Sequence, residues 1–196
     1  MEKQDYKKFL IASRITNGRN KSFKVQKYAF HLWQELASLG YTRSSFYLGV
    51  CYDFGLGTRK NFKKAFSAYL LAAEVGHPEA QYNIYHLLIN GVGVKKDIKK
   101  AIKWLKESAK HNCTDALRDL GYRYYEGKII QRDYKKAVIH YRMAAKKGDV
   151  KAAWNLGLCY KEGRGVNKST RWTNYWIKKA AYLGHKESKE YVKNNL

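Results

Sequence analysis

Small and apolar residues recur with a fixed spacing through most of this 196-residue chain. Residues 41–76, 77–112, 113–148 and 149–184 align with one another without a gap, so the pattern has a period of 36 residues. A period of this length indicates tandem structural repeats.

The first half of each repeat reads as a helix. Positions 4, 8 and 12 hold small or apolar residues, for example Ala152, Leu156 and Tyr160 in the fourth repeat. Residues four apart lie on one face of a helix. Position 15 is a glycine in all four copies, and glycine readily takes the left-handed conformation that ends a helix. We therefore predict a first helix, helix A, over positions 2–14.

A second helix, helix B, follows in each repeat. Position 21 is always a good N-cap residue, whose side chain accepts a hydrogen bond from the first helical turn. Position 33 is always alanine, and the last position is glycine or asparagine. Large residues at positions 28 and 29 are expected to fill the core. The N-cap residues are Asn61, Asp97, Asp133 and Ser169, and the predicted core residues include Trp104, Trp154 and Trp176.

One such helical hairpin cannot bury its apolar face alone, whereas stacked neighbours can. The sequence therefore predicts an all-α fold, a right-handed αα-superhelix, as a single solenoid domain over residues 1–196. Residues 5–40 read as a degenerate first repeat, since Ala29, Ala37 and Gly40 fall on repeat positions. Its loop is predicted at residues 17–22, and residues 185–196 are predicted to form a polar capping helix.

The pattern A-x-x-x-L-G-x-x-Y-x-x-G-x-G-V, followed by N/D-x-x-K-A and A-A-x-x-G, resembles the SEL-one-like repeat (SLR), a relative of the tetratricopeptide repeat. The fourth repeat carries it best, with Gly157, Gly163, Gly165, Val166 and Gly184 at the expected places. The resemblance implies a non-enzymatic protein-binding scaffold. The third repeat departs locally, with Ile129 and Ile130 in place of the second glycine and the valine.

Composition adds a strong positive charge, because 39 Lys and Arg stand against 16 Asp and Glu, a formal net charge of +23. Many cations fall between helices A and B and in the first turn of helix B. Cations at that end oppose the helix dipole, so they do not serve helix stability. Either the repeat tolerates them or they attract an acidic protein, nucleic acid or phosphate. We call the following residues the basic ridge: Lys60, Lys63, Lys64, Lys95, Lys96, Lys99, Lys100, Lys135, Lys136, Lys168 and Arg171.

Positions 7, 10 and 14 of helix A are expected to face the concave side of a solenoid. They mix aromatic, amide and acidic side chains, which suits a peptide or a protein edge better than a phosphate backbone. Some of these side chains are expected to pack against neighbouring repeats. We call the following residues the concave-face set: Tyr47, Phe54, Asn83, His86, Asn90, Asp119, Tyr122, Glu126, Asn155 and Glu162.

The remaining chemistry is sparse. The six histidines form no pair at metal-ligand spacing, and no nucleophile motif or phosphate-binding loop is present, so we expect no enzymatic activity and no cofactor or metal. Three cysteines indicate free thiols in a reducing, cytoplasmic location. The only apolar run near the N-terminus is too short for a signal peptide, and no segment reaches membrane-spanning length.

Three functions remain open on the sequence. The first is a scaffold or adaptor that binds a protein segment on the concave-face set. The second is a bacterial immunity protein that neutralises an acidic toxin or effector. The third is a nucleic-acid or phosphate-surface binder that uses the basic ridge, and this one is less favoured because the acids of the concave-face set would repel phosphates and the tryptophans are assigned to the core.

Overall fold

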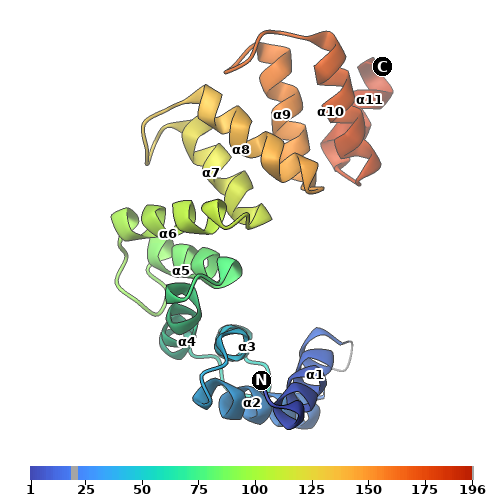
Figure 1. The fold of residues 1–196 in the computed structure, drawn as a ribbon. Coiled ribbons are helices and arrows are strands. Elements are labelled where there is room, and N and C mark those ends of the chain that lie inside the picture. Colours follow the sequence, from blue (N-terminus) through green and yellow to red (C-terminus); the bar gives the residue numbers. More distant parts are fainter. Residues whose placement is uncertain (19–21, 196) are drawn as a thin grey trace. The chain divides into compact units, whose positions relative to one another are not determined.

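The computed structural model describes residues 1–18 and 22–195, and the described chain is entirely helical apart from its connections (Figure 1). The predicted loop at residues 17–22 falls largely on residues outside this part. The all-α solenoid prediction is confirmed. The helices of the described chain are α1 (Lys3–Asn17), α2 (Phe23–Ser38), α3 (Thr42–Phe54), α4 (Phe62–Glu74), α5 (Pro78–Asn90), α6 (Ile98–Lys110), α7 (Thr114–Glu126), α8 (Tyr134–Lys146), α9 (Val150–Glu162), α10 (Thr170–Tyr182) and α11 (Lys186–Asn195).

Helix A of each aligned repeat has the predicted bounds. The helices α3, α5, α7 and α9 each cover positions 2–14 of their repeat. Each ends at a glycine in the left-handed region, as Gly55 does with a φ of 74°. A residue with a Cβ is strained in this conformation, which explains why glycine occupies position 15 in all four copies.

Helix B of each aligned repeat begins with a side-chain cap. The Asn61 side chain accepts a hydrogen bond from the backbone N–H of Lys64 at 3.0 Å, and Asp97, Asp133 and Ser169 cap α6, α8 and α10 in the same way. These bonds satisfy one of the free N–H groups at each helix start. The N-cap prediction at position 21 is therefore confirmed in all four copies.

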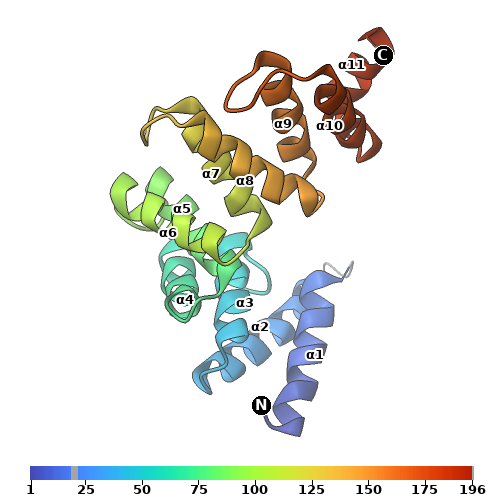
Figure 2. The same cartoon turned by 45° about the horizontal axis from the view of Figure 1, so that its top comes forward.

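The helices fall into two compact units, Met1–His111 and Asn112–Leu196. In the first unit, α1 packs against α2, α3 against α4 and α5 against α6, and α2–α3 and α4–α5 contacts join successive pairs (Figures 1 and 2). Its largest fully buried side chains include Trp33, Tyr69 and Tyr85. The Trp33 indole N–H donates to the Thr16 hydroxyl at 2.9 Å, which satisfies its one polar atom and ties α2 to α1.

In the second unit, α7 packs against α8 and α9 against α10, while α11 lies along α10 (Figure 1). Its core contains Leu117, Tyr141, Leu156 and Ile177. The helix α11 is polar and buries only Ser188, in keeping with the terminal helix predicted from the sequence. That all five hairpins form a single domain stays a prediction.

Close packing between helices A and B depends on position 9. A Cβ added to Gly121 would come within 2.8 Å of the Tyr141 ring, and one added to Gly49 within 2.5 Å of the Tyr69 ring. In the second repeat this position is Tyr85, which is fully buried and takes the space itself, and the residue at the position of Tyr141 is there the smaller Leu105. The large ring at this interface thus comes from helix B in the first and third repeats and from helix A in the second.

The tryptophans only partly follow their core prediction. Trp176 is 6% exposed and belongs to the core, whereas Trp104 and Trp154 are half-buried. Trp154 stacks on His185 with ring centroids 5.2 Å apart. Trp104 lines a cavity described below, so its assignment as an inaccessible core residue was wrong.

Candidate protein-binding surfaces

The concave-face set divides between residues that hold the fold together and residues that are free to bind. In the first unit, Tyr47 stacks on the buried Trp33 with ring centroids 4.5 Å apart, so it serves the packing of α3 on α2. The Asn83 side chain hydrogen-bonds the Tyr69 hydroxyl, which itself donates to Asp53 Oδ2 at 3.2 Å. Burial raises the pKa of Tyr69, with the Asp53 carboxylate adding to the effect, so its hydroxyl stays protonated and donates.

The other members in the first unit are more accessible. Phe54 is 65% exposed at the C-terminal end of α3. Asn90 is exposed at the end of α5, where its amide donates to the His86 carbonyl at 3.0 Å. The His86 ring lies edge-on to Tyr82 at 4.5 Å and is half-buried. An exposed aromatic and an accessible amide remain available to a partner on this unit.

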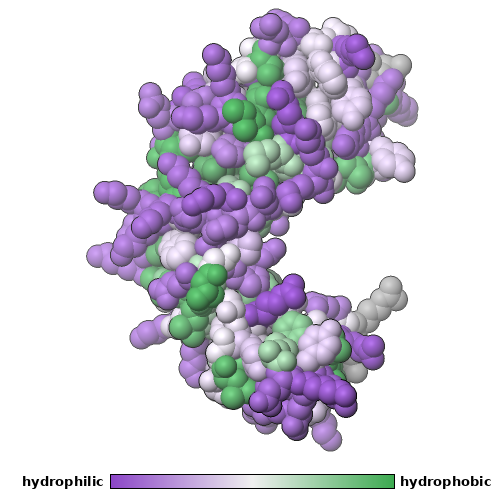
Figure 3. Space-filling model, in the orientation of Figure 1, coloured by the Kyte–Doolittle hydropathy of each residue, from purple (hydrophilic) through white to green (hydrophobic). Residues whose placement is uncertain are grey.

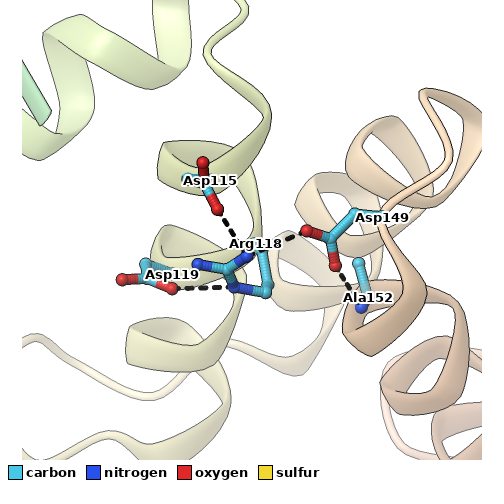
Figure 4. Close-up of polar contacts among 5 residues, drawn as sticks. All are labelled: Asp115, Arg118, Asp119, Asp149 and Ala152. Atoms are coloured by element: carbon cyan, nitrogen blue, oxygen red, sulfur yellow. Dashed lines mark hydrogen bonds and ion pairs between the residues drawn. The ribbon is translucent and has the colours of Figure 1, made fainter. Parts of the chain in front are cut away.

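In the second unit, all three acids of the concave-face set are paired with cations of the same unit. Asp119 accepts from Arg118 Nε at 3.0 Å, in a cluster where Arg118 Nη1 also reaches Asp115 at 2.6 Å and Asp149 at 2.9 Å (Figure 4). Figure 4 shows that Arg118 projects from α7 toward the start of α9, where Asp149 also accepts from the Ala152 backbone N–H at 2.7 Å. Arg118 therefore bridges two successive repeats.

Glu126 and Glu162 have their own partners. Glu126 lies 2.6 Å from Lys128 Nζ and 3.4 Å from Arg123, and the Lys128 hydrogen bond lowers the pKa of this carboxyl. Glu162 pairs with Arg164 Nε at 2.8 Å and accepts from the Tyr125 hydroxyl at 3.2 Å. These carboxylates are neutralised locally, so the sequence-based expectation that they would repel phosphates is weakened.

Two members of the concave-face set in the second unit remain open to solvent. Tyr122 is 45% exposed, with the Arg123 guanidinium over its ring at 5.5 Å. Asn155 is half-buried on α9. The structure describes each unit by itself, so that all ten residues line one surface stays a prediction.

Every residue of the basic ridge is exposed. Within the described chain, only two members form ion pairs, and each pairs with its own N-cap aspartate: Lys100 with Asp97 at 3.6 Å and Lys136 with Asp133 at 3.2 Å. Lys64 and Lys136 also lie over the rings of Tyr52 and Tyr124, each at 5.5 Å. Most of the ridge therefore presents cations without a carboxylate partner in the described chain, and four of its members lie over aromatic rings: Lys60, Lys64, Lys136 and Arg171.

The structure adds a cavity of about 560 Å³ that the sequence did not predict, among α4, α5, α6 and the connection before α6. Its lining is mostly apolar, with lysines and the N-cap aspartate at one side. A smaller cavity of about 410 Å³ shares Lys100 and Trp104 with it. The sequence hinted at this cavity only through Trp104, which follows Lys100 by four residues and so lies on the same face of the helix. The lining of the larger cavity is Phe66, Leu70, Leu88, Val94, Lys95, Lys96, Asp97, Lys100 and Trp104.

Neither a membrane-spanning helix nor a metal-binding cluster is found in the described chain. No described helix is long and apolar enough to cross a bilayer. Among residues 1–18 and 22–195, no three His, Cys, Asp or Glu side chains lie together as metal ligands would. The three cysteines are buried, and Cys51 and Cys159 are free thiols.

Solved structures of other repeat proteins resemble this chain over most of its length. A Sel1 repeat protein from Oxalobacter formigenes is 30% identical, with a TM-score of 0.83, over 86% of this chain and 49% of that protein. The c5321 protein, a protective antigen of uropathogenic Escherichia coli with an SLR fold, is 29% identical, with a TM-score of 0.84, over 94% of this chain and 39% of that protein. The chain thus spans half or less of these relatives.

A likeness at lower identity shows the fold alone. The immunity protein Pa5087 from Pseudomonas aeruginosa is 17% identical, with a TM-score of 0.60, over 96% of this chain and 69% of that protein. No curated protein matches the chain.

The family model of the Sel1 repeat, the repeat of the SLR family, matches residues 11–41, 42–77, 78–113, 114–149 and 150–185. The first of these matches covers much of the repeat that the sequence identified as degenerate. Sel1 repeats form scaffolds that typically mediate protein interactions and are generally non-catalytic. With five matched repeats over most of its length, the chain belongs to the Sel1 repeat family.

Proposed function

We propose that this chain is a non-catalytic protein-interaction module whose partner is an acidic protein. The observation that carries the proposal is the basic ridge, in which nine of the eleven members have no carboxylate partner within the described chain. A formal charge of +23 would steer an acidic partner toward this surface and would raise the association rate. The concave-face set, with Phe54, Asn90 and Tyr122 accessible, is the proposed second contact surface.

Nucleic acid is the alternative ligand for the same cations. Its binding constant would fall steeply with salt, with log K decreasing by about 0.9 per phosphate contact for each tenfold rise in salt on duplex DNA. The half-buried Trp104 shares a cavity with apolar residues and with Asp97. This cavity suits an apolar side chain better than a nucleotide base, because the phosphates next to the base would approach the Asp97 carboxylate.

An immunity protein would be a special case of the proposed function, with a toxin or effector as the acidic partner. The support for this form is the charge, because the likeness to Pa5087 concerns the fold only. Co-expression with an acidic toxin encoded beside this chain would test it, since an immunity protein would restore growth and a general adaptor would not.

We also propose a reducing compartment, such as the cytoplasm. Cys51 and Cys159 are buried as free thiols. Proteins of oxidising compartments are often stabilised by disulfide bonds, and the described chain forms none.

The test is affinity capture from the native cells at moderate salt after nuclease treatment, with two immobilised forms of the protein. One is the native chain and the other carries Lys63→Glu, Lys64→Glu, Lys135→Glu and Lys136→Glu. We expect one acidic protein at near-equal amounts on the native chain, and much less on the variant. Bound material that disappears with nuclease, or retention that is equal on both forms, would contradict the proposal.

A second pair of variants tests the concave-face set. Phe54→Ala removes an exposed ring. Asn155→Ala removes an amide that has no hydrogen-bond partner within the described chain. They are preferable to Asn83→Ala, which would also remove the hydrogen bond to Tyr69. Weaker capture at an unchanged melting temperature would support this surface, and unchanged capture would leave the ridge as the whole interface.

A further inference from the structure

The α4–α6 cavity has the size and the lining of a binding pocket. Its volume of about 560 Å³ lies within the range of about 300–1,000 Å³ that is typical of ligand pockets. Phe66 and Leu70 come from α4, Leu88 from α5, and Trp104 from α6. These four side chains provide the kind of apolar floor on which one large side chain of a partner can be desolvated.

The polar side of the cavity is cationic. Lys95, Lys96 and Lys100 line it, against a single carboxylate, that of Asp97. That carboxylate is already engaged, because its Oδ1 accepts the Lys100 backbone N–H at 2.9 Å as the cap of α6. Lys95 and Lys96 are exposed and have no ion-pair partner in the described chain. The cavity therefore offers two free ammonium groups beside an apolar floor.

The cationic field extends along α6 beyond the cavity. Residues 95–110 carry seven lysines against Asp97 and Glu107. Lys103 and Glu107 line the adjoining cavity, together with Gln81 and His111, which hydrogen-bond each other at 3.0 Å. Figure 3 shows the surface over α6 as mainly hydrophilic, with hydrophobic side chains exposed over α4 beside it. The apolar region thus borders the lysine-rich helix α6, while Glu74 and Glu107 line the adjoining cavity.

We propose that the α4–α6 cavity binds a short acidic peptide segment of the partner, in which one Trp, Phe or Leu residue is flanked by Asp or Glu. The apolar residue enters the cavity against Phe66, Leu70 and Trp104, and its acidic neighbours meet Lys95, Lys96 and Lys100. This inference rests on the proposed function, because it locates the contact of the acidic partner. It differs from a binding mode on the concave-face set, since the site is formed by α4, α6 and the connection before α6, with only Leu88 from a helix A.

The occupant follows from charge complementarity and from the shape of the lining. A purely acidic segment would leave the apolar floor uncovered, and a purely apolar segment would leave Lys95 and Lys96 unpaired. In protein interfaces, a few buried anchor residues usually supply most of the binding energy, and polar or charged residues surround them. Nucleic acid would satisfy the lysines, but its backbone would also approach the Asp97 carboxylate.

The experiment starts from a library of random 12-residue peptides displayed on phage and selected on the native full-length chain at moderate salt. We expect enriched peptides to combine one large apolar residue with flanking Asp or Glu. The best peptide is then synthesised with a fluorescent label, and its affinity is measured by anisotropy. A second peptide has the apolar residue replaced by alanine.

Two charge variants of the protein complete the design. Lys95→Glu with Lys96→Glu changes the cavity, and Arg59→Glu with Lys60→Glu makes the same charge change at the same repeat positions one repeat earlier, outside the cavity. All four residues are exposed, so both variants are expected to fold, which circular dichroism would verify. We expect the cavity variant to lose about tenfold or more in affinity, the control to lose about threefold or less, and the alanine peptide to lose about tenfold.

Each outcome bears on a different statement. If acidic peptides bind but the two variants lose affinity equally and the alanine peptide binds as well as its parent, the cavity inference is wrong while the proposed function stands. If selection enriches no acidic peptide, the cavity inference is wrong, and the capture experiment above decides the proposed function separately. If a single-stranded oligonucleotide binds the native chain and competes with the peptide at equal or better affinity, the cavity is a nucleic-acid site and the inference is overturned.

Discussion

Arg118 Nη1 lies 2.9 Å from Asp149 Oδ2 and thereby joins position 6 of one repeat to position 1 of the next. Positions 6 and 1 are also in contact at two other repeat junctions, where aromatic rings replace the ion pair. Phe46 stacks on His77 with ring centroids 4.5 Å apart, and Trp154 stacks on His185 at 5.2 Å. One location in the repeat thus holds an ion pair at one junction and aromatic pairs at two others.

The Arg118–Asp149 pair should stabilise the second unit. The Asp149 side chain is 9% exposed and that of Arg118 20%, so removal of the guanidinium leaves a nearly buried carboxylate without its cation. We expect Arg118→Met to lower the free energy of unfolding by about 2–3 kcal/mol, at or below the lower end for a broken buried pair because this one is partly solvated. Urea denaturation would measure it.

A double-mutant cycle provides the control. Asp149→Asn keeps an oxygen that can cap α9 and removes the charge, so the cycle with Arg118→Met isolates the ion pair. We expect a coupling of about 1–2 kcal/mol. Additive effects of the two substitutions would show that the pair does not hold the junction.

Gly121→Ala should destabilise the protein although alanine favours helices. The added Cβ would lie 2.8 Å from the Tyr141 ring and 3.2 Å from the Ala137 carbonyl oxygen, and Tyr141 is 1% exposed and cannot move aside. We expect a loss of about 2 kcal/mol in the free energy of unfolding, which exceeds the gain in helix propensity. Chemical denaturation of the single variant would test this expectation.

The second repeat suggests the compensating change. It carries the large Tyr85 at the glycine position together with Leu105 at the position of Tyr141. Gly121→Ala combined with Tyr141→Leu should therefore recover part of the loss relative to the sum of the single changes. A double variant that is less stable than this sum would indicate that the contact with Tyr141 is not the cause.

Acid should destabilise the protein through His140. Burial lowers the pKa of this side chain below its usual value of 6.5, and its Nδ1 has no hydrogen-bond partner in the described chain. The unfolded state then binds the proton more readily, so stability present above about pH 6.5 is lost as the pH falls from there through the folded pKa. We expect His140→Phe, which keeps the stack on Tyr124, to be more stable at pH 7 and to lose less stability at pH 5.

His77 is a second histidine that should make the protein less stable in acid. Burial lowers its pKa as well, and its Nδ1 accepts the Ala80 backbone N–H at 3.4 Å, which only an unprotonated nitrogen can do. Some acid sensitivity should therefore remain in His140→Phe. Thermal melts of the native chain and this variant between pH 5 and pH 7 would show parallel curves if His140 had no part.

Two cysteines should be unreactive while the protein is folded. Burial raises the pKa of Cys51 and of Cys159 to about 12, and they are 1% and 0% exposed. In a Cys113→Ser variant at pH 8, we expect reaction with an aromatic disulfide reagent to be at least ~100-fold slower in buffer than in urea, because the thiolate is the attacking form. Comparable rates in the two conditions would contradict the buried, protonated state.

The periodic features of the fold were predictable because each follows from local chemistry repeated at a fixed spacing. Gly55 and Asn61 mark a helix end and a helix start by backbone conformation and capping, and neither depends on distant residues. The bounds of α3 and its equivalents followed directly. The degenerate repeat was placed from three small residues, and a family match now covers 11–41.

The candidate site was less predictable because it depends on what each side chain meets in the neighbouring repeat. Position 7 of helix A carries Tyr47, which stacks on Trp33, and Asp119, which pairs with Arg118, so one sequence position serves two purposes. Trp104 was assigned to the core from its repeat position, but it lines the edge of a cavity. Periodicity gives the face of a helix and not the neighbour that covers it.

The differing junction pairs have a consequence for folding. A chain of similar hairpins risks docking one hairpin against the wrong neighbour, a misassembly typical of repeat arrays. An out-of-order contact would set Asp149 against Phe46, or Arg118 against His77, and would leave a charge without its counter-ion. The differences between the junction pairs therefore favour docking of the hairpins in their native order over docking in any other order.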